Sequence, residues 1–488
     1  MEFNQTGVMK QISKLNYRDL TIFLIPVIVF SVYLAVFNPC IATYDSFNQM
    51  HQIATGTFMN WHPFFHTFIV MMCLKIYPST TVVAVLQILT FSLMWMVICK
   101  YHRNDSIRNF RIQVILSLII CLIPINALYS ITLWKDVLFS YFLMFLCFLI
   151  KVMVDREGKV GLRFIILVSL ILAFVSGLRG NGLYVAVISM AIYTVYLFVK
   201  NNRKMSAALP ILTVTFILLI ASLNIAYDVQ DNEKDAIATK VAHMLADYDL
   251  NLEIDAADRE KIYEIIDKDK VREAYTPTDS DPIFAITDYK TFEKDKGTYI
   301  GLAVKYSLKN PLHCIGYLFS SSPMVWDIIK DSDWKGRPYY MSADHDRLES
   351  DTYEYHVVRQ NPIIEPYENL SYANWGTPAF DFLNSLSLTI ESSFLDTLFN
   401  NPALYMYLSI IFLILIQTAV RTKEIWLMYV PNILNILAIF FSTPIQDYRY
   451  LYPNLLVCYL LIIILVSLKY DSDKRISNPL NYLRELKR

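Results

Sequence analysis

The sequence has few glycines, and it lacks the glycine-rich and metal-binding motifs of many soluble enzymes. Only 12 of its 488 residues are Gly. It contains no Walker phosphate-binding loop, no dinucleotide-type glycine fingerprint, no His-Glu-x-x-His zinc motif and no clear nucleophile elbow. These absences argue against nucleotide chemistry in the cytoplasm. The sequence identifies no cofactor and no metal ligands, and it leaves a divalent metal open.

Cysteines are also few, and their positions do not suggest disulfides. Five of the seven lie in or beside apolar runs, so only Cys40 and Cys314 are expected to face the outside. A disulfide framework is therefore not implied.

Long apolar runs are abundant, since 55% of the residues are hydrophobic. A helix needs about 20 mostly apolar residues to cross the hydrocarbon of a bilayer, and runs of that length recur toward both ends of the chain. The pattern predicts an all-α polytopic membrane protein with about ten transmembrane helices. The predicted spans are residues 20–38, 80–99, 112–128, 137–154, 162–178, 183–199, 207–226, 403–420, 425–442 and 453–469.

Charge is divided unevenly along the chain, although the net charge is only −1. Residues 227–401 hold 32 of the 44 acidic residues but only 17 of the 43 Lys and Arg. The rest of the chain is therefore basic. An acidic central segment with basic short loops is typical of a membrane enzyme or transporter, and it argues against a nucleic-acid partner.

The basic loops predict the orientation, because Lys and Arg collect on the cytoplasmic side. They precede span one and follow spans two, four, six, eight and ten, which all lie on one side in a ten-span protein. Both termini are then cytoplasmic. The stretch 62–77 is expected to be an interfacial helix, because an eleventh span there would reverse everything after it.

Four regions follow from this topology. Residues 1–226 form an N-terminal transmembrane domain with seven spans and an outer loop at 39–79. Residues 227–402 form an extracytoplasmic α or α+β domain inserted between spans seven and eight. Residues 403–470 hold the last three spans, and residues 471–488 are a basic cytoplasmic tail.

The central domain is rich enough in Tyr, Trp, Ile and Leu to fold. Its residues 229–272 are expected to form charged amphipathic helices. Residues 273–300 and 330–378 are rich in Pro, Asp, Tyr and Gly and are expected to form loops or short strands. The uncharged stretch 310–326 is too short to span and is expected to pack on the membrane surface.

The first outer loop carries Asp45 and Gln49, followed by Trp61 and His62. An Asp with amides and imidazoles near the membrane surface can supply a general base and orient a hydroxyl. The alternative is a hydrophilic loop in which Trp61 anchors at the headgroups.

Three further outer turns carry charges. Lys135 and Asp136 sit between two apolar runs, where they form either a site or a simple interfacial ion pair. The remaining candidates lie in Gly-Leu-Arg-Gly-Asn-Gly, ending at Gly182, and in the Tyr-Arg-Tyr motif before the last span; they are Arg179, Asn181, Tyr448 and Arg449. An aromatic belt explains the tyrosines but does not explain Arg449.

Together these motifs resemble the integral-membrane GT-C glycosyltransferases, which take sugars from polyprenyl phosphates. Members have an Asp after the first span, then a Gly and a His-Pro or Pro-Pro pair; this chain has Asp45, Gly56 and His62-Pro63 in that order. It resembles a poorly characterised bacterial branch of that superfamily from residue 20 to 470. Family members often have Asp-Glu where this chain has Asp45-Ser46, and the long domain 227–402 offers no matching motif.

The resemblance implies a transferase in the cytoplasmic membrane that moves a sugar from a polyprenyl-phosphate carrier, with inversion, to a glycan or protein acceptor outside. Asp45 would take the acceptor proton, and cationic residues would hold the phosphate leaving group. Three alternatives stay open: a surface-polysaccharide polymerase or ligase, a transporter or flippase of lipid-linked sugars, and a membrane-anchored sensor. Polar residues at span ends, without an internal repeat, argue against the transporter.

Overall fold

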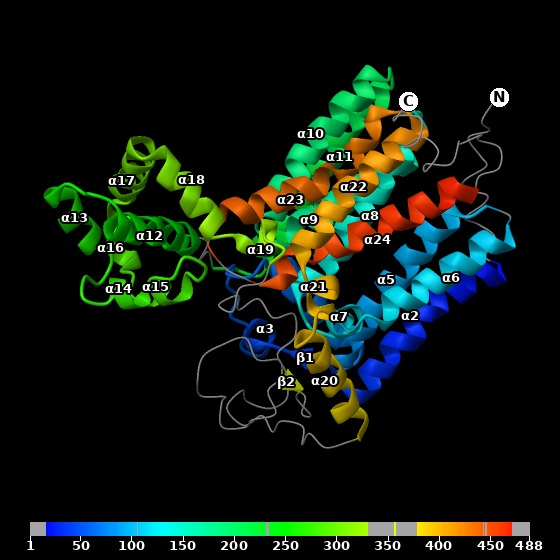
Figure 1. The fold of residues 1–488 in the computed structure, drawn as a ribbon, viewed down its shortest axis with the longest axis horizontal. Helices are drawn as coiled ribbons and strands as arrows, with labels where there is room; N and C mark the ends of the chain where they lie inside the picture. The colour runs from blue at the N-terminus through cyan, green and yellow to red at the C-terminus, as the bar shows by residue number, and fades with distance from the viewer. Residues whose placement is uncertain are drawn as a thin grey trace.

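The computed structural model describes residues 16–104, 106–230, 234–329, 356–357, 378–442, 444 and 447–470. These residues are almost entirely helical (Figure 1). The two short strands β1 (Ile41–Ala42) and β2 (His356–Val357) pair in antiparallel fashion.

The described residues include eight helices that are long and apolar enough to cross a membrane, which confirms an all-α polytopic membrane protein. In two of them a short 3-10 segment continues into an α-helix. The eight are α2 (Tyr17–Val36), α5 (Thr81–His102), α8 (Lys135–Asp155), α10 (Gly182–Val199), α11 (Arg203–Ala226), α22 (Pro402–Val420), η3 (Lys423–Tyr429) with α23 (Val430–Phe441), and η4 (Tyr448–Leu451) with α24 (Tyr452–Tyr470).

The other two predicted spans are less regular. The span expected at 112–128 is broken into α6 (Ile107–Leu122) and α7 (Pro124–Ser130), which meet at a bend of 72°. Pro124 lacks the N–H that a continuous helix needs, so a new helix begins there. The span expected at 162–178 is α9 (Leu162–Leu178), whose 17 residues give a length of about 26 Å.

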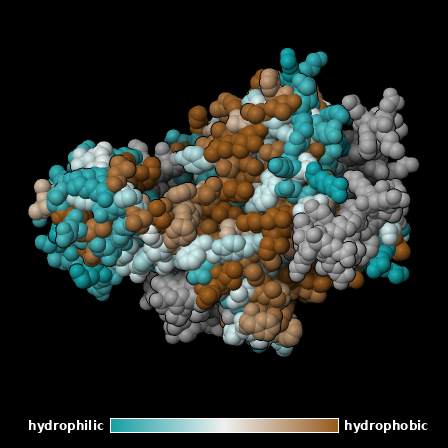
Figure 2. Space-filling model, turned by 45° about the horizontal axis from the view of Figure 1, so that its top comes forward, coloured by the Kyte–Doolittle hydropathy of each residue, from teal (hydrophilic) through white to brown (hydrophobic). Residues whose placement is uncertain are grey.

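Helix α8 forms the centre of the bundle. Nearly all of its side chains are buried, and it packs against α5, α9, α23, α24 and η3. Around it, α2 packs on α5, α9 on α11, and α22 on α24. The apolar side chains that remain exposed on the outer helices form the broad hydrophobic surface in Figure 2. This surface is the one expected to contact lipid.

The segment between α2 and α5 forms two short helices, α3 (Tyr44–Thr55) and α4 (Phe64–Ile76). Helix α3 ends at Gly56, whose φ of 70° is readily adopted by glycine. Helix α4 has 13 residues, or about 20 Å, and packs against α5, α9 and α11. It is too short to cross the hydrocarbon as a straight helix.

A separate group of helices, residues 234–320, has its own hydrophobic core, which includes Leu245, Ile262 and Phe292. We call it the helical domain. Its members are α12 (Lys234–Asn251), α13 (Ala256–Tyr263), α14 (Val271–Ala274), α15 (Asp281–Ala285), α16 (Tyr289–Lys294), α17 (Lys296–Lys309) and α18 (Pro311–Ser320). The buried residues of this core lie between Ala238 and Tyr306.

The prediction of loops or short strands at 273–300 was wrong for much of that stretch, which forms short helices. Pro282 occupies the first turn of α15. Asp288 caps α16 by accepting hydrogen bonds from the N–H groups of Lys290 and Thr291. Pro and Asp here begin helices, because both are favoured at helix N-termini.

Cys40 is buried and donates to Thr80 Oγ1 at 3.3 Å, so the expectation that it faces the outside was wrong. The remaining described helices are α19 (Pro323–Trp326), α20 (Pro378–Glu391) and α21 (Leu395–Phe399). Apart from β2 and Pro378, the predicted loops at 330–378 lie outside the described residues, as does the tail 471–488.

Candidate functional site

The first turn of α3 is fastened to the segment that precedes α8. Thr43 and Ser46 cap α3, and the Ser46 hydroxyl also donates to Leu133 O at 2.9 Å. Trp134 Nε1 donates to Thr43 Oγ1 at 2.7 Å. Asp45 in the first turn of α3 is thereby held near the first turn of α8. Two helix N-termini, each with partial positive charge, meet at this place.

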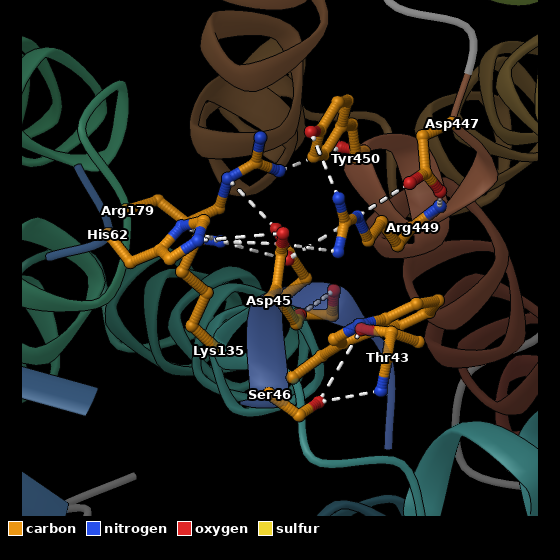
Figure 3. A network of polar contacts seen from close by, with 12 residues as sticks. Thr43, Asp45, Ser46, His62, Lys135, Arg179, Asp447, Arg449 and Tyr450 are labelled. Carbon is orange, nitrogen blue, oxygen red and sulfur yellow. Dashed lines mark hydrogen bonds and ion pairs between the residues drawn. The ribbon is translucent and has the colours of Figure 1, made fainter. Parts of the chain in front are cut away.

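Asp45 lies among the cations of this region (Figure 3). Its carboxylate lies 2.7 Å from Nη1 of Arg449, 3.5 Å from Nζ of Lys135 and 3.5 Å from Nε2 of His62. These partners come from the loop before α4, from the start of α8 and from η4. The chain therefore brings together side chains that are up to 404 residues apart.

Asp136 is a second carboxylate and is almost completely buried. Its oxygens lie 3.1 Å from Nε of Arg179, 3.8 Å from Nζ of Lys135 and 3.9 Å from Nε of Arg449. Lys135 and Arg449 are thus shared between Asp45 and Asp136.

Aromatic rings fix the two guanidinium groups. Arg449 lies over the Trp134 ring, 4.7 Å from its centroid, and Arg179 lies over the Tyr450 ring at 4.4 Å. Arg449 also pairs with Asp447 at 2.7 Å. Stacking orients a guanidinium while leaving its in-plane N–H groups available for hydrogen bonds.

We call Asp45, His62, Lys135, Asp136, Arg179, Asp447 and Arg449 the charged cluster. It contains three carboxyl groups, three cations and one imidazole. Burial favours a raised pKa for Asp45, but the positive charges of Arg449 and Lys135 outweigh it, and the carboxyl keeps a pKa well below its usual range. Asp45 is therefore ionised at neutral pH.

His62 is neutral in this cluster. Burial and the charge of Lys135 lower the pKa of its imidazole to about 4. Lys135 Nζ lies 3.1 Å from His62 Nδ1 and can only donate, so Nδ1 accepts and Nε2 carries the proton. That N–H is on the side of the ring that approaches Asp45.

Burial also raises the pKa of Asp447. This residue is the N-cap of η4, where its carboxylate accepts from the N–H of Arg449 as well as pairing with the guanidinium. The preceding loop is held by the helical domain: Lys240 Nζ donates to Ser442 O at 2.9 Å, and the Ser280 N–H donates to Pro444 O at 3.0 Å.

Residues 53–299, about half of the chain, match the model of a family of unknown function, DUF6020. The chain belongs to DUF6020. No curated protein and no solved structure gave a significant match.

The DUF6020 match contains part of the charged cluster, namely His62, Lys135, Asp136 and Arg179, together with most of the helical domain. Asp45, Asp447 and Arg449 lie outside the matched residues. The cluster is completed by residues on both sides of the DUF6020 match.

Of the ten residues predicted for a site, six lie in the charged cluster: Asp45, His62, Lys135, Asp136, Arg179 and Arg449. The other four lie beside it or elsewhere. Gln49 lies one turn after Asp45 and pairs through Oε1 with His66 Nδ1 at 2.9 Å. Trp61 is partly exposed and packs its ring edge against Phe284 of the helical domain.

Asn181 supports the cluster indirectly. It donates to Asn435 Oδ1 at 3.0 Å, and Asn435 donates to the backbone oxygen of Tyr450 at 3.2 Å. Tyr448 is fully buried, with its ring near that of Tyr129. Gly182, three residues after Arg179, serves packing, since a Cβ there would collide with the Val175 carbonyl oxygen.

Three contributors were missed by the sequence prediction: Asp447, Tyr450 and Asn435. Asp447 and Tyr450 flank Arg449 closely enough to have been considered with it. Asn435 could have been found as an amide within an otherwise apolar predicted span. Among the described residues there is no group of three or more His, Cys, Asp and Glu side chains placed to hold a metal ion.

Proposed function

We propose that this DUF6020 protein is a membrane glycosyltransferase that moves a sugar from a polyprenyl-phosphate carrier to a hydroxyl acceptor. The acceptor is a cell-envelope glycan, a lipid-linked glycan or a protein. In this proposal the chain has ten spans and cytoplasmic termini, and residues 227–402 lie outside the cytoplasmic membrane. The fold is proposed to be of the GT-C type.

The observation that carries the proposal is the placement of one ionised carboxylate, Asp45, against two cations at the ends of spanning helices. Arg449 lies at 2.7 Å and Lys135 at 3.5 Å. Transfer from a lipid phosphate needs a base for the acceptor and positive charge for the leaving phosphate, both near the membrane surface. The charged cluster holds both kinds of group.

Asp45 and Arg449 neutralise each other in the structure, and donor binding can change this pairing. A donor phosphate that draws Arg449 away from Asp45 removes the charge that lowers the carboxyl pKa. Asp45 then becomes a better proton acceptor at the moment when the donor is bound.

The proposed chemical step is a direct displacement. The acceptor oxygen bonds to the anomeric carbon, the bond from that carbon to the phosphate oxygen breaks, and the electron pair leaves with the polyprenyl phosphate. The acceptor proton passes to Asp45. Arg449 and Lys135 stabilise the phosphate as its charge grows, and the anomeric configuration inverts.

Arg179 and His62 have supporting roles in this proposal. Arg179 neutralises the buried Asp136, so that Asp136 does not cancel the charge of Lys135 and Arg449. His62, with its proton on Nε2, orients the Asp45 carboxylate.

A comparison of cell-envelope and lipid-linked glycans tests the proposal. Cells carrying the wild type, Asp45→Asn or no protein are compared, with Asp267→Asn as the matched control because Asp267 is half-exposed in the helical domain. We expect one glycan component to be lost in the Asp45→Asn and null cells and retained in the control.

Identical glycans in all four strains, with equal amounts of folded protein in the three strains that carry the protein, would contradict the proposal. Loss of long chains only, with single additions intact, would instead favour a polymerase or ligase. Accumulation of an unchanged lipid-linked sugar on the cytoplasmic side would favour a flippase.

A further inference from the structure

Helix α18 carries two different faces, and its inward face is fixed to the helical domain. Tyr317 is buried, and its hydroxyl lies 2.9 Å from His243 Nδ1. His313, one turn earlier, pairs with Asp247 at 2.6 Å. These contacts set the rotation of α18 about its axis, so the direction of its opposite face is also set.

The opposite face is a row of large apolar side chains. Leu312, Ile315 and Phe319 follow one another at spacings of three and four residues, and Leu312 is 83% exposed. The row continues onto α17 with Val304 and Leu308, which are also exposed. Spacings of this kind place side chains on one side of a helix.

The part of this row on α18 lies in a stretch of sequence that has no charged residue. Between Lys309 and Asp327 there is no Asp, Glu, Lys or Arg. The rest of the helical domain is strongly charged, and Figure 2 shows it as mostly hydrophilic. A row of exposed large apolar side chains on such a domain marks a contact surface.

The row is continuous with the lipid-facing surface of the bundle. The Phe319 ring lies 5.2 Å from the Phe440 ring at the end of α23. On α23 itself, Ile433, Leu437 and Phe441 are exposed at successive turns. In Figure 1, α18 runs crosswise to α10 and meets α23 at its end.

We propose that the exposed face of α17 and α18 inserts into the adjoining lipid leaflet and holds the helical domain against the membrane. A helix that lies in the membrane plane buries its apolar face at the boundary between headgroups and acyl chains. The contacts of Lys240 and Ser280 with residues 442 and 444 then connect this membrane-held domain to the loop before Arg449. The proposal does not depend on glycosyl transfer.

A fluorescent probe on α18 tests this contact in lipid nanodiscs. Cys314 is first replaced by Ser, and the other six cysteines are buried. An NBD group is attached at Ile315→Cys or, if that variant folds poorly, at Leu312→Cys. The matched control is Ala257→Cys, an exposed position on α13.

We expect the α18 probe to emit at shorter wavelength and to be quenched by doxyl-labelled lipid at least about twofold more than the control, because an interfacial face lies roughly 5–10 Å into the boundary region. Aqueous iodide should quench in the opposite order. Equal iodide quenching at both positions without lipid quenching would overturn the proposal. Protection from both quenchers would also overturn it, since a protein surface would then cover α18.

Discussion

Each end of the helical bundle buries charged side chains, and the two ends do so in different ways. At one end Asp19, in the first turn of α2, pairs with Lys100 at 2.9 Å and with Arg103. At the other end lies the charged cluster around Asp45. We call these the Asp19 end and the Asp45 end.

The Asp19 end is simple. Asp19 accepts from the N–H of Asn16 in a capping box, and its two cations both come from the end of α5. Its carboxylate therefore ties one helix start to one helix end. Each of these interactions stabilises the packing of α2 on α5.

The Asp45 end draws on at least four separate parts of the chain and shares its cations between acids. Arg449 approaches Asp45, Asp136 and Asp447, and Lys135 approaches Asp45, Asp136 and His62. Two helices could be joined with far fewer charges, as the Asp19 end shows. Shared partners also allow one ion pair to be exchanged for another, which a substrate phosphate would require.

The largest expected effect is a loss of turnover when one side chain of the Asp45 end is changed and the fold is kept. Asp45→Asn keeps the size of the side chain but removes the proton acceptor, so turnover of purified protein should fall by about two to four orders of magnitude. Arg449 keeps Asp447 and Lys135 keeps Asp136 as partners, and the Thr43 and Ser46 cap of α3 is untouched, so the melting temperature should fall less than for the matched change at the Asp19 end. Turnover close to that of the wild type would assign Asp45 a structural role.

The matched change at the other end should have the opposite outcome. Asp19→Asn removes the buried carboxylate that Lys100 and Arg103 share, and breaking a buried ion pair in this way costs about 3–5 kcal/mol. Thermal unfolding in detergent should show this loss. The turnover per folded molecule should remain near that of the wild type, and a large drop would mean that both ends act on the reaction.

The grouping of charged residues at the Asp45 end was predictable from the sequence, because the hydrophobic runs and the basic loops predict which turns share a side of the membrane. Topology alone thus predicted that Asp45, Lys135, Arg179 and Arg449 lie on one side, and the structure brings them together. The runs also predicted the long helices.

The features that the sequence did not predict depend on rotation about helix axes and on local packing. The periodicity of hydrophobic residues does not specify either of these. Gln49 is one turn from Asp45, yet its side chain pairs with His66. The break at Pro124 occurs within an apolar run that reads as continuous. The short helices at 271–294 depend on caps, whose Pro and Asp residues also occur in loops.

A smaller loss of turnover is expected when either arginine of the Asp45 end is replaced by Lys, and its size should differ between the two. Arg449→Lys keeps the charge but loses the ring contact with Trp134 and the paired N–H groups, so turnover should fall by about 10- to 100-fold, as for loss of one or two charge-assisted hydrogen bonds. Arg179→Lys should cost less, because Arg179 pairs with Asp136 and not with Asp45.

Turnover and donor affinity should be measured separately for both arginine variants. The proposal expects Arg449→Lys to lower turnover more than it weakens donor binding, since the leaving phosphate gains charge during the reaction. Unchanged turnover and affinity in both variants would remove the two arginines from the site.

The smallest effect concerns pH, to which the Asp45 end should respond through the imidazole of His62. His62 has a pKa of about 4 in the folded protein and about 6.5 in an unfolded chain. As pH falls below about 6.5, the unfolded chain takes up the proton first, so the stability contributed by neutral His62 is intact above that pH and declines toward pH 4. His62→Gln stays neutral throughout, so its melting temperature should fall less than that of the wild type between pH 7.5 and 4.5.

The difference between the two proteins isolates His62 from other groups, such as His243, that also have lowered pKa values. Between pH 7.5 and 8 the stability difference should change little, because His62 is neutral in both the folded and the unfolded chain at these pH values. A melting-temperature difference that does not vary between pH 7.5 and 4.5 would mean that His62 is not held neutral by burial and Lys135.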